Sequence, residues 1–153
     1  MRQHETRAAP AAGVPTAAAV LGYAGAIPFV TLALATFVSG AAGPLAIQAV
    51  YAYAVAILSF LGGVHWGVAL TSRVEPSFAR LGAGVVPSLA GWAAFLIGGR
   101  IGLWLLAASF AAMLAYDLRQ TRAGVTPGWY PRLRWPLTLA VIGSLLLASV
   151  NAT

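Results

Sequence analysis

The feature that most constrains this chain is an apolar stretch from Ala46 to Thr71 that contains no Asp, Glu, Lys or Arg. As a helix rising about 1.5 Å per residue it reaches roughly 39 Å, which exceeds the ~30 Å hydrocarbon core of a bilayer. A backbone can cross hydrocarbon only when its polar groups are satisfied internally. The stretch therefore predicts a tilted transmembrane helix, and this helix contains one histidine, His65.

The composition extends this prediction to the rest of the chain. Of 153 residues, 60% are hydrophobic and 8% are charged, whereas soluble domains carry roughly 25% charged residues. The absence of cysteine excludes disulfides, thiolate metal sites and thiol catalysis. The net charge of +6 comes entirely from arginines that lie between apolar blocks. We therefore expect anionic lipid headgroups, and no nucleic acid, as their partner. The fold class that follows is all-α, an integral membrane helical bundle.

Five apolar blocks divide the chain into a tail and one domain. Residues 1–13 are polar and small, and we expect a flexible N-terminal tail there. Residues 14–153 are expected to form a single transmembrane helical domain. Its five predicted transmembrane helices are residues 14–38, 46–71, 81–99, 101–118 and 135–150.

Glycine and proline mark the boundaries of these blocks. Gly98-Gly99-Arg100 predicts a tight reversal, because glycine supplies the backbone freedom. Pro136 is expected near a first helical position, where its missing N–H costs nothing. A signal peptide cleaved near Ser39-Gly40-Ala41 is the alternative for the first block. A signal core is about 7–15 residues long, and this block is far longer.

The distribution of arginine predicts the orientation. Eight arginines lie in the tail and in the connections around residues 72–80 and 119–134, against one, Arg100, on the other side. Short arginine-rich loops stay in the cytoplasm, so we expect the N-terminus inside and the C-terminus outside. The lysine-free, alanine-rich composition is typical of a GC-rich bacterial genome and favours the bacterial cell inner membrane.

Small residues gather on one side of the central helix. On a helical wheel they are Ala52, Ala56, Ser59, Gly63 and Gly67. Such a face lets another helix approach closely, although glycine and alanine are also common in membrane helices generally. His65 falls nearly opposite, near Leu58, Gly62, Ala69 and Ser72, so we expect protein or water rather than lipid on that side as well. We therefore expect this helix to be covered on both sides and to be the hub of the bundle.

Four interpretations of His65 remain open. A neutral imidazole hydrogen-bonded to a neighbouring helix is the simplest, because buried polar groups satisfy one another. A ligand role, such as bonding a quinone carbonyl beside Trp66, follows from the functional bias of intramembrane ionisable groups. Proton transfer is the third. Haem ligation is the fourth. The chain has no second intramembrane histidine, so it could not form a bis-histidine haem site by itself.

The remaining ionisable residues are expected at the inner surface. Glu75 beside Arg73, and Asp117 beside Arg119, predict wet surface pairs worth under about 1 kcal/mol. Aromatic residues and arginines lie together just before the last block, and the candidate headgroup contacts are Trp129, Tyr130, Arg132 and Arg134.

Several segments together resemble one family. They are LGYAGAIPF (21–29), SFLGGVHWG (59–67), VPSL (86–89) and WYPRLR (129–134). In this order they are similar to the domain-of-unknown-function 3429 family, the transmembrane protein 69-like small multi-pass membrane proteins. The resemblance implies a membrane protein of bacteria with relatives in mitochondria. It implies no activity, cofactor or site residue.

Two functions remain after these considerations. The first is a non-enzymatic structural, accessory or assembly partner of another membrane complex, or a chain that self-associates, because no nucleophile–base pair, metal cluster or cofactor motif can be assembled. The second is binding or transport of a small molecule, a quinone or lipid, in a pocket near His65 and Trp66. The candidate ligand or interaction residues are His65, Trp66, Ser59, Gly63 and Gly67.

Overall fold

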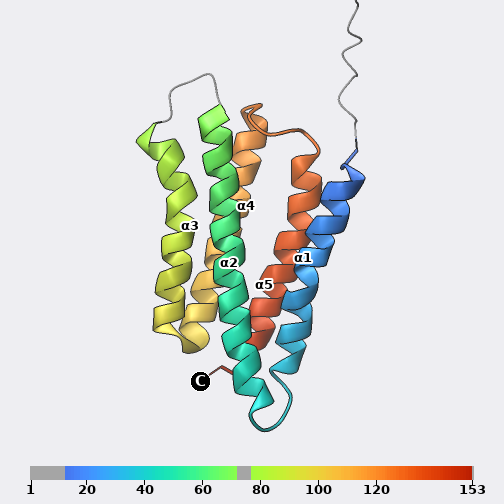
Figure 1. Cartoon of the computed structure of the whole chain (residues 1–153), viewed down its shortest axis with the longest axis vertical. Coiled ribbons are helices and arrows are strands. Elements are labelled where there is room, and N and C mark those ends of the chain that lie inside the picture. Colours follow the sequence, from blue (N-terminus) through green and yellow to red (C-terminus); the bar gives the residue numbers. More distant parts are fainter. Residues whose placement is uncertain (1–12, 72–76, 153) are drawn as a thin grey trace, which may run out of the picture.

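A computed structural model describes residues 13–71 and 77–152 and contains five helices in that part of the chain (Figure 1). They are α1 (Thr16–Ala35), α2 (Ala42–Thr71), α3 (Phe78–Ile97), α4 (Gly99–Arg122) and α5 (Tyr130–Ser149). No strand occurs in the described residues. The predicted all-α fold class is therefore confirmed.

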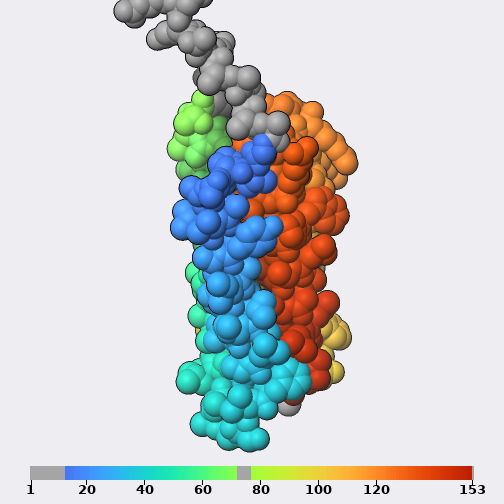
Figure 2. Space-filling model, turned by 90° about the vertical axis from the view of Figure 1, so that its right-hand side faces the viewer, coloured from blue at the N-terminus to red at the C-terminus, as the bar shows by residue number. Residues whose placement is uncertain are grey.

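Four of these helices, α1 to α4, are long and apolar enough to cross a membrane. The fifth, α5, lies side by side with α1 along the bundle (Figure 2). It carries Arg132 and Arg134 near its start, and it falls short of that criterion. Five crossings and the side on which each end lies therefore remain predictions.

The helices form a closed ring in which each packs against its neighbours in sequence and α5 returns to α1. Only α2 contacts all four other helices, which agrees with the central place predicted for it. The start of α1 and the end of α5 lie at opposite ends of the bundle (Figure 1). We call the end that holds the start of α1 the arginine end, because Arg80, Arg119, Arg122 and Arg132 lie near it.

The interior is filled by large apolar side chains. Phe29 and Phe110 are almost completely buried, and their rings meet edge to face with centroids 5.8 Å apart. Around them lie Val50, Leu58, Leu103, Leu106 and Leu145, all fully buried. The outer surface is also apolar, with exposed Leu, Phe and Trp side chains along α1 and α3. A surface of this kind fits hydrocarbon, and in water it would be a large exposed apolar patch.

Glycines inside the bundle allow α2 and α3 to approach closely. A Cβ on Gly62 would overlap the carbonyl oxygen of Gly84, and a Cβ on Gly84 would overlap the indole of Trp66. The Trp66 indole Nε1 donates to the carbonyl of Leu81 at 2.9 Å. The contact between the two helices therefore depends on glycine at both positions.

Some predicted boundaries change. The second helix starts at Ala42, and the fourth runs to Arg122, so it is longer than predicted. Gly98 ends α3 with φ +66°, which confirms the glycine reversal. At α5 it is Pro131 that occupies the first turn, and Pro136 lies inside the helix. Most of the predicted tail and the residues Arg73 and Glu75 lie outside the described residues.

Candidate functional site

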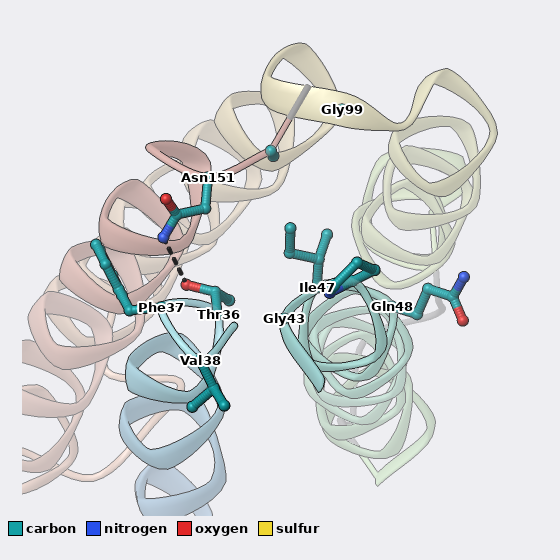
Figure 3. A pocket seen from close by; sticks show the side chains of 10 residues that line it. Thr36, Phe37, Val38, Gly43, Ile47, Gln48, Gly99 and Asn151 are labelled. Atoms are coloured by element: carbon teal, nitrogen blue, oxygen red, sulfur yellow. Dashed lines mark hydrogen bonds between the residues drawn. The ribbon is translucent and has the colours of Figure 1, made fainter. Parts of the chain in front are cut away.

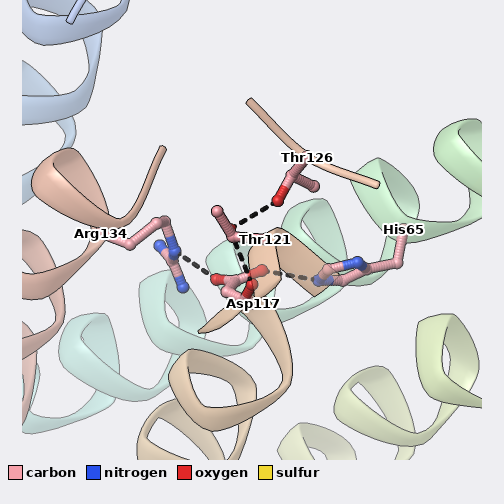
Figure 4. A network of polar contacts seen from close by, with 5 residues as sticks. All are labelled: His65, Asp117, Thr121, Thr126 and Arg134. Carbon is pink, nitrogen blue, oxygen red and sulfur yellow. Dashed lines mark hydrogen bonds and ion pairs between the residues drawn. The ribbon is translucent and has the colours of Figure 1, made fainter. Parts of the chain in front are cut away.

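Three ionisable side chains from three helices meet inside the arginine end of the bundle (Figure 4). Asp117 on α4 is 0% exposed and lies between His65 on α2 and Arg134 on α5. Arg134 Nε donates to Asp117 Oδ2 at 2.6 Å, and His65 Nε2 lies 2.9 Å from Asp117 Oδ1. We call these three residues the ionic cluster. It connects the helices α2, α4 and α5.

The two contacts of the carboxylate differ in quality. The Arg134 contact is a charge-assisted hydrogen bond, the stronger class of polar contact. The His65 contact has ion-pair distance but does not meet hydrogen-bond geometry at Oδ1. A carboxylate without water needs a compensating charge, and Arg134, itself only 7% exposed, supplies it.

Neighbouring residues hold the cluster in place. The ring of Tyr116 meets the His65 imidazole edge to face, with centroids 4.8 Å apart. Thr121 Oγ1 is 3.1 Å from the Asp117 carbonyl, to which it donates, and 2.7 Å from Thr126 Oγ1. These contacts tie the last turns of α4 to the connection that leads into α5 (Figure 4).

Some buried polar atoms near the cluster have no partner. They are His65 Nδ1, Asp117 Oδ1, Arg134 Nη2 and Thr138 Oγ1. A cavity of about 10 Å³ borders His65 and is also lined by Arg80, Tyr116 and Gln120. A site of that size holds one water molecule at most. The described residues include no metal-binding group of His, Cys, Asp and Glu.

The structure separates His65 from Trp66. His65 faces the interior with Leu58, Gly62 and Ala69, as predicted. Trp66 lies over α3 and is 38% exposed. The cavity that borders His65 is too small for a quinone ring and does not include Trp66. This cavity therefore does not provide the pocket predicted beside these two residues, and that pocket stays a prediction.

The predicted small-residue face of α2 points away from the bundle. Ser59, Gly63 and Gly67 are all exposed, as are Ala52 and Ala56. A Cβ added at Gly63 or Gly67 would meet nothing within 4 Å. No helix in the described part of the chain covers the face, so the cover predicted on this side is not found there, and the close approach to α3 occurs at Gly62 instead. We call these five residues the α2 small face.

The predicted surface residues divide into two groups. Arg132 is exposed, and the rings of Trp129 and Tyr130 meet edge to face at 6.0 Å, near the arginine end. Arg134, expected at the headgroups, is instead buried and paired. Asp117, expected in a wet surface pair with Arg119, is the centre of the ionic cluster.

The sequence contained a signal for Asp117. It is the single aspartate of the chain, and the predicted fourth helix already included it. An ionisable residue inside a membrane helix normally has a partner in the bundle. The partner could not be named, because Arg134 and His65 are distant in sequence and meet only when α4 lies between α2 and α5.

A larger cavity of about 400 Å³ opens at the opposite end of the bundle (Figure 3). Its walls include Gly43, Gln48 and Gly99, and Asn151 Nδ2 donates to Thr36 Oγ1 at 3.3 Å across one side. The cavity is open to the surface and has no charged residue in its lining.

Apolar helices of membrane-spanning length around a buried ionic cluster define a multi-pass α-helical membrane protein. Within this class, the chain belongs to the family described as Protein of unknown function (DUF3429), whose family model matches residues 14–150. The resemblance noted in the sequence is thereby confirmed.

Two relatives support this assignment, both named Transmembrane protein 69. The one from Xenopus tropicalis is 36% identical over 143 residues, which cover 91% of this chain and 56% of the relative. The one from Mus musculus is 27% identical over 138 residues, which cover 89% of this chain and 56% of the relative. The chain thus spans about half the length of these relatives. No solved structure matches it.

Proposed function

We propose that this protein is a non-enzymatic accessory or assembly partner of another protein in the bacterial inner membrane, and that a helix of this partner packs on the α2 small face. The observation that carries the proposal is the exposure of Gly63 and Gly67. Each glycine costs a helix about 0.5–1 kcal/mol relative to alanine, yet a Cβ at either position would meet nothing within 4 Å among the described residues.

The chemistry of the membrane favours this use of the face. Lipid tails are as apolar as leucine, so helices associate in a bilayer through close van der Waals packing at small residues. Ala52, Ala56 and Ser59 extend the two glycines into a strip along about half of α2. Such a strip accepts a helix at short distance, whereas a lipid chain gains little from it.

The ionic cluster gives this surface a rigid support. It holds α2 to α4 and α5 on the side of α2 opposite the small face. A fixed helix loses less conformational freedom when a partner docks on it. The cluster is therefore assigned a structural role, and no enzymatic step is part of the proposal.

The proposed topology has five crossings, with the N-terminus in the cytoplasm. The five parallel or antiparallel helices of one bundle and the gathering of arginines at one end support it. The α5 helix is less apolar than the others, and pairing of Arg134 with Asp117 removes much of the cost of placing it beside them.

The absence of cysteine allows a direct test. A Ser59→Cys variant carries one thiol on the small face, and Gly143→Cys carries one on an exposed part of α5 as a matched control. Labelling of this thiol with a benzophenone maleimide and irradiation in native membranes, followed by mass spectrometry, is expected to join Ser59→Cys to one other membrane protein and to leave the control unjoined.

A second pair of variants tests the packing itself. Gly63→Leu fills open space in the free chain, so the protein is expected to fold normally and to lose its partner in mild-detergent purification. Gly143→Leu is expected to keep it. A cross-link only between two copies would replace the proposal with self-association. If this protein is recovered without any partner in both the cross-linking and the purification experiments, no helix docks on this face.

A further inference from the structure

A second cavity lies beside the ionic cluster, on the side away from α3. Helices α1, α2 and α5 form its walls, and Phe110 of α4 lines its inner side. It has a volume of about 150 Å³. Gly22, Gly25 and Ala26 line it from α1, so the small side chains of this helix leave the space open.

The lining is apolar except for two residues of α5, Arg134 and Thr138. Both are at least nine-tenths buried, and each has a hydrogen-bond donor without a partner, Arg134 Nη2 and Thr138 Oγ1. Buried donors are rarely left unpaired, because the loss of water is then not compensated. Two such donors one helical turn apart, on one cavity, point to a missing acceptor.

Thr138 departs from the usual behaviour of a helical threonine. Thr31, Thr71 and Thr121 each donate to the carbonyl four residues earlier in their helix. This local bond is the ordinary way to satisfy the hydroxyl in an apolar helix. Thr138 is buried and forms no such bond, so its hydroxyl is available to a group outside its own helix.

The size of the cavity limits the occupant. A protein cavity of about 150 Å³ lined by apolar side chains holds one benzene-sized ring. Two donors on one side of such a ring match a carbonyl oxygen. We propose that this cavity binds the head of a neutral lipid-soluble quinone, with one ring carbonyl accepting from Arg134 and Thr138.

The charge of the ionic cluster favours a neutral head over an anionic one. Arg134 already compensates Asp117. A second carboxylate or a phosphate would add an uncompensated negative charge next to a fully buried aspartate, at a high desolvation cost. A carbonyl oxygen meets the same donors without that cost.

The entrance of the cavity faces the membrane. Leu21 of α1 and Phe60 of α2 line it and are 73% and 66% exposed. On the surface of a membrane helix these side chains contact lipid. An apolar tail attached to the ring can therefore leave between α1 and α2 and lie in the bilayer. The quinone can therefore enter the site from the bilayer without passing through water.

Two alanines of α1 provide a matched test. Ala26 lines the cavity, whereas Ala24 is exposed on the other side of the helix. Leucine at position 26 fills the space for the ring, and leucine at position 24 does not. The protein is purified in mild detergent from quinone-containing bacterial membranes, and its bound lipids are extracted and identified by mass spectrometry. Wild type and Ala24→Leu are expected to carry a quinone that Ala26→Leu lacks.

A binding titration with a decyl-substituted benzoquinone covers the case in which the native ligand is lost during purification. Ala26→Leu is expected to bind at least tenfold more weakly than wild type, and Ala24→Leu within twofold. Thr138→Val removes one hydrogen bond and is expected to bind about threefold to tenfold more weakly. Without ligand, the same variant should melt at the same or a higher temperature, since it removes an unpaired buried hydroxyl.

Three results would overturn the proposal. Equal decyl-benzoquinone binding by wild type and Ala26→Leu would place the quinone elsewhere. Saturable binding of oleate in place of the quinone would assign the cavity to a carboxylate. No saturable binding of either molecule would leave water as the partner of the two donors. None of these results depends on the α2 small face, so the two proposals succeed or fail separately.

Discussion

Replacing Arg134 by methionine tests whether the ionic cluster is a buried structural element. Methionine keeps most of the volume of the side chain and removes its charge. At an effective dielectric constant of about 20, opposite unit charges at the observed 2.6 Å attract by about 6 kcal/mol. Desolvation of both ions offsets part of this attraction. Removing one partner of a buried pair typically costs about 3–5 kcal/mol, and we expect a loss of this size.

The matched control is two residues away. Arg132 is in the same turn of α5 but exposed, and Arg132→Met is expected to change stability by less than about 1 kcal/mol. Both variants are measured by reversible SDS unfolding in detergent micelles, followed by tryptophan fluorescence. The five tryptophans of the chain supply the signal.

A double variant identifies the cause of the loss. Combining Arg134→Met with Asp117→Leu leaves no unpaired charge, so most of the stability lost in Arg134→Met should return. If Arg134→Met and Arg132→Met have the same small effect, the guanidinium of Arg134 is not buried against Asp117. If the double variant is less stable than both single variants, the loss comes from packing and not from charge.

Two further predictions concern the helix contact and the topology. Gly62→Ala is expected to lower the free energy of unfolding by about 1–3 kcal/mol, because its Cβ overlaps Gly84 and the helices must separate. Gly63→Ala, where the space is open, should be neutral or slightly stabilising, and equal effects in the same SDS assay would contradict the packing of α2 on α3. A C-terminal alkaline phosphatase fusion is expected to be active, since this enzyme requires an extracytoplasmic location. An inactive fusion that is present at a normal level would reverse the orientation.

The helical-wheel projection of α2 predicted that the small residues and His65 lie on opposite sides of this helix. It did not predict which of the two sides the other helices cover. It placed His65 opposite the small residues, and the structure agrees. It also suggested close packing at Gly63 and Gly67, whereas the contact with α3 is at Gly62. Both sides carry glycine, and periodicity alone does not distinguish a helix of the same chain from a helix of another chain.

The errors at Asp117 and Arg134 have one common origin. The sequence pairs Asp117 with Arg119 at a wet surface and places Arg134 at the headgroups, because charged residues near a helix end normally reach water. In the folded chain α4 continues beyond Asp117 to Arg122, and α5 begins before Arg134. The two residues are therefore covered by the bundle, and they neutralise each other where water does not reach them.

The sequence by itself determined the environment, the helical class, the family and the central position of α2. These properties follow from local quantities, namely the length of apolar stretches and the places where charges and glycines interrupt them. The tertiary structure decided that Asp117 pairs with Arg134, that the α2 small face remains uncovered, and that two donors of α5 border an apolar cavity. The physical reason is that these properties depend on the rotation of each helix against its neighbours. In a chain apolar on nearly every side, that rotation is set by packing between helices and not by the pattern along any one of them.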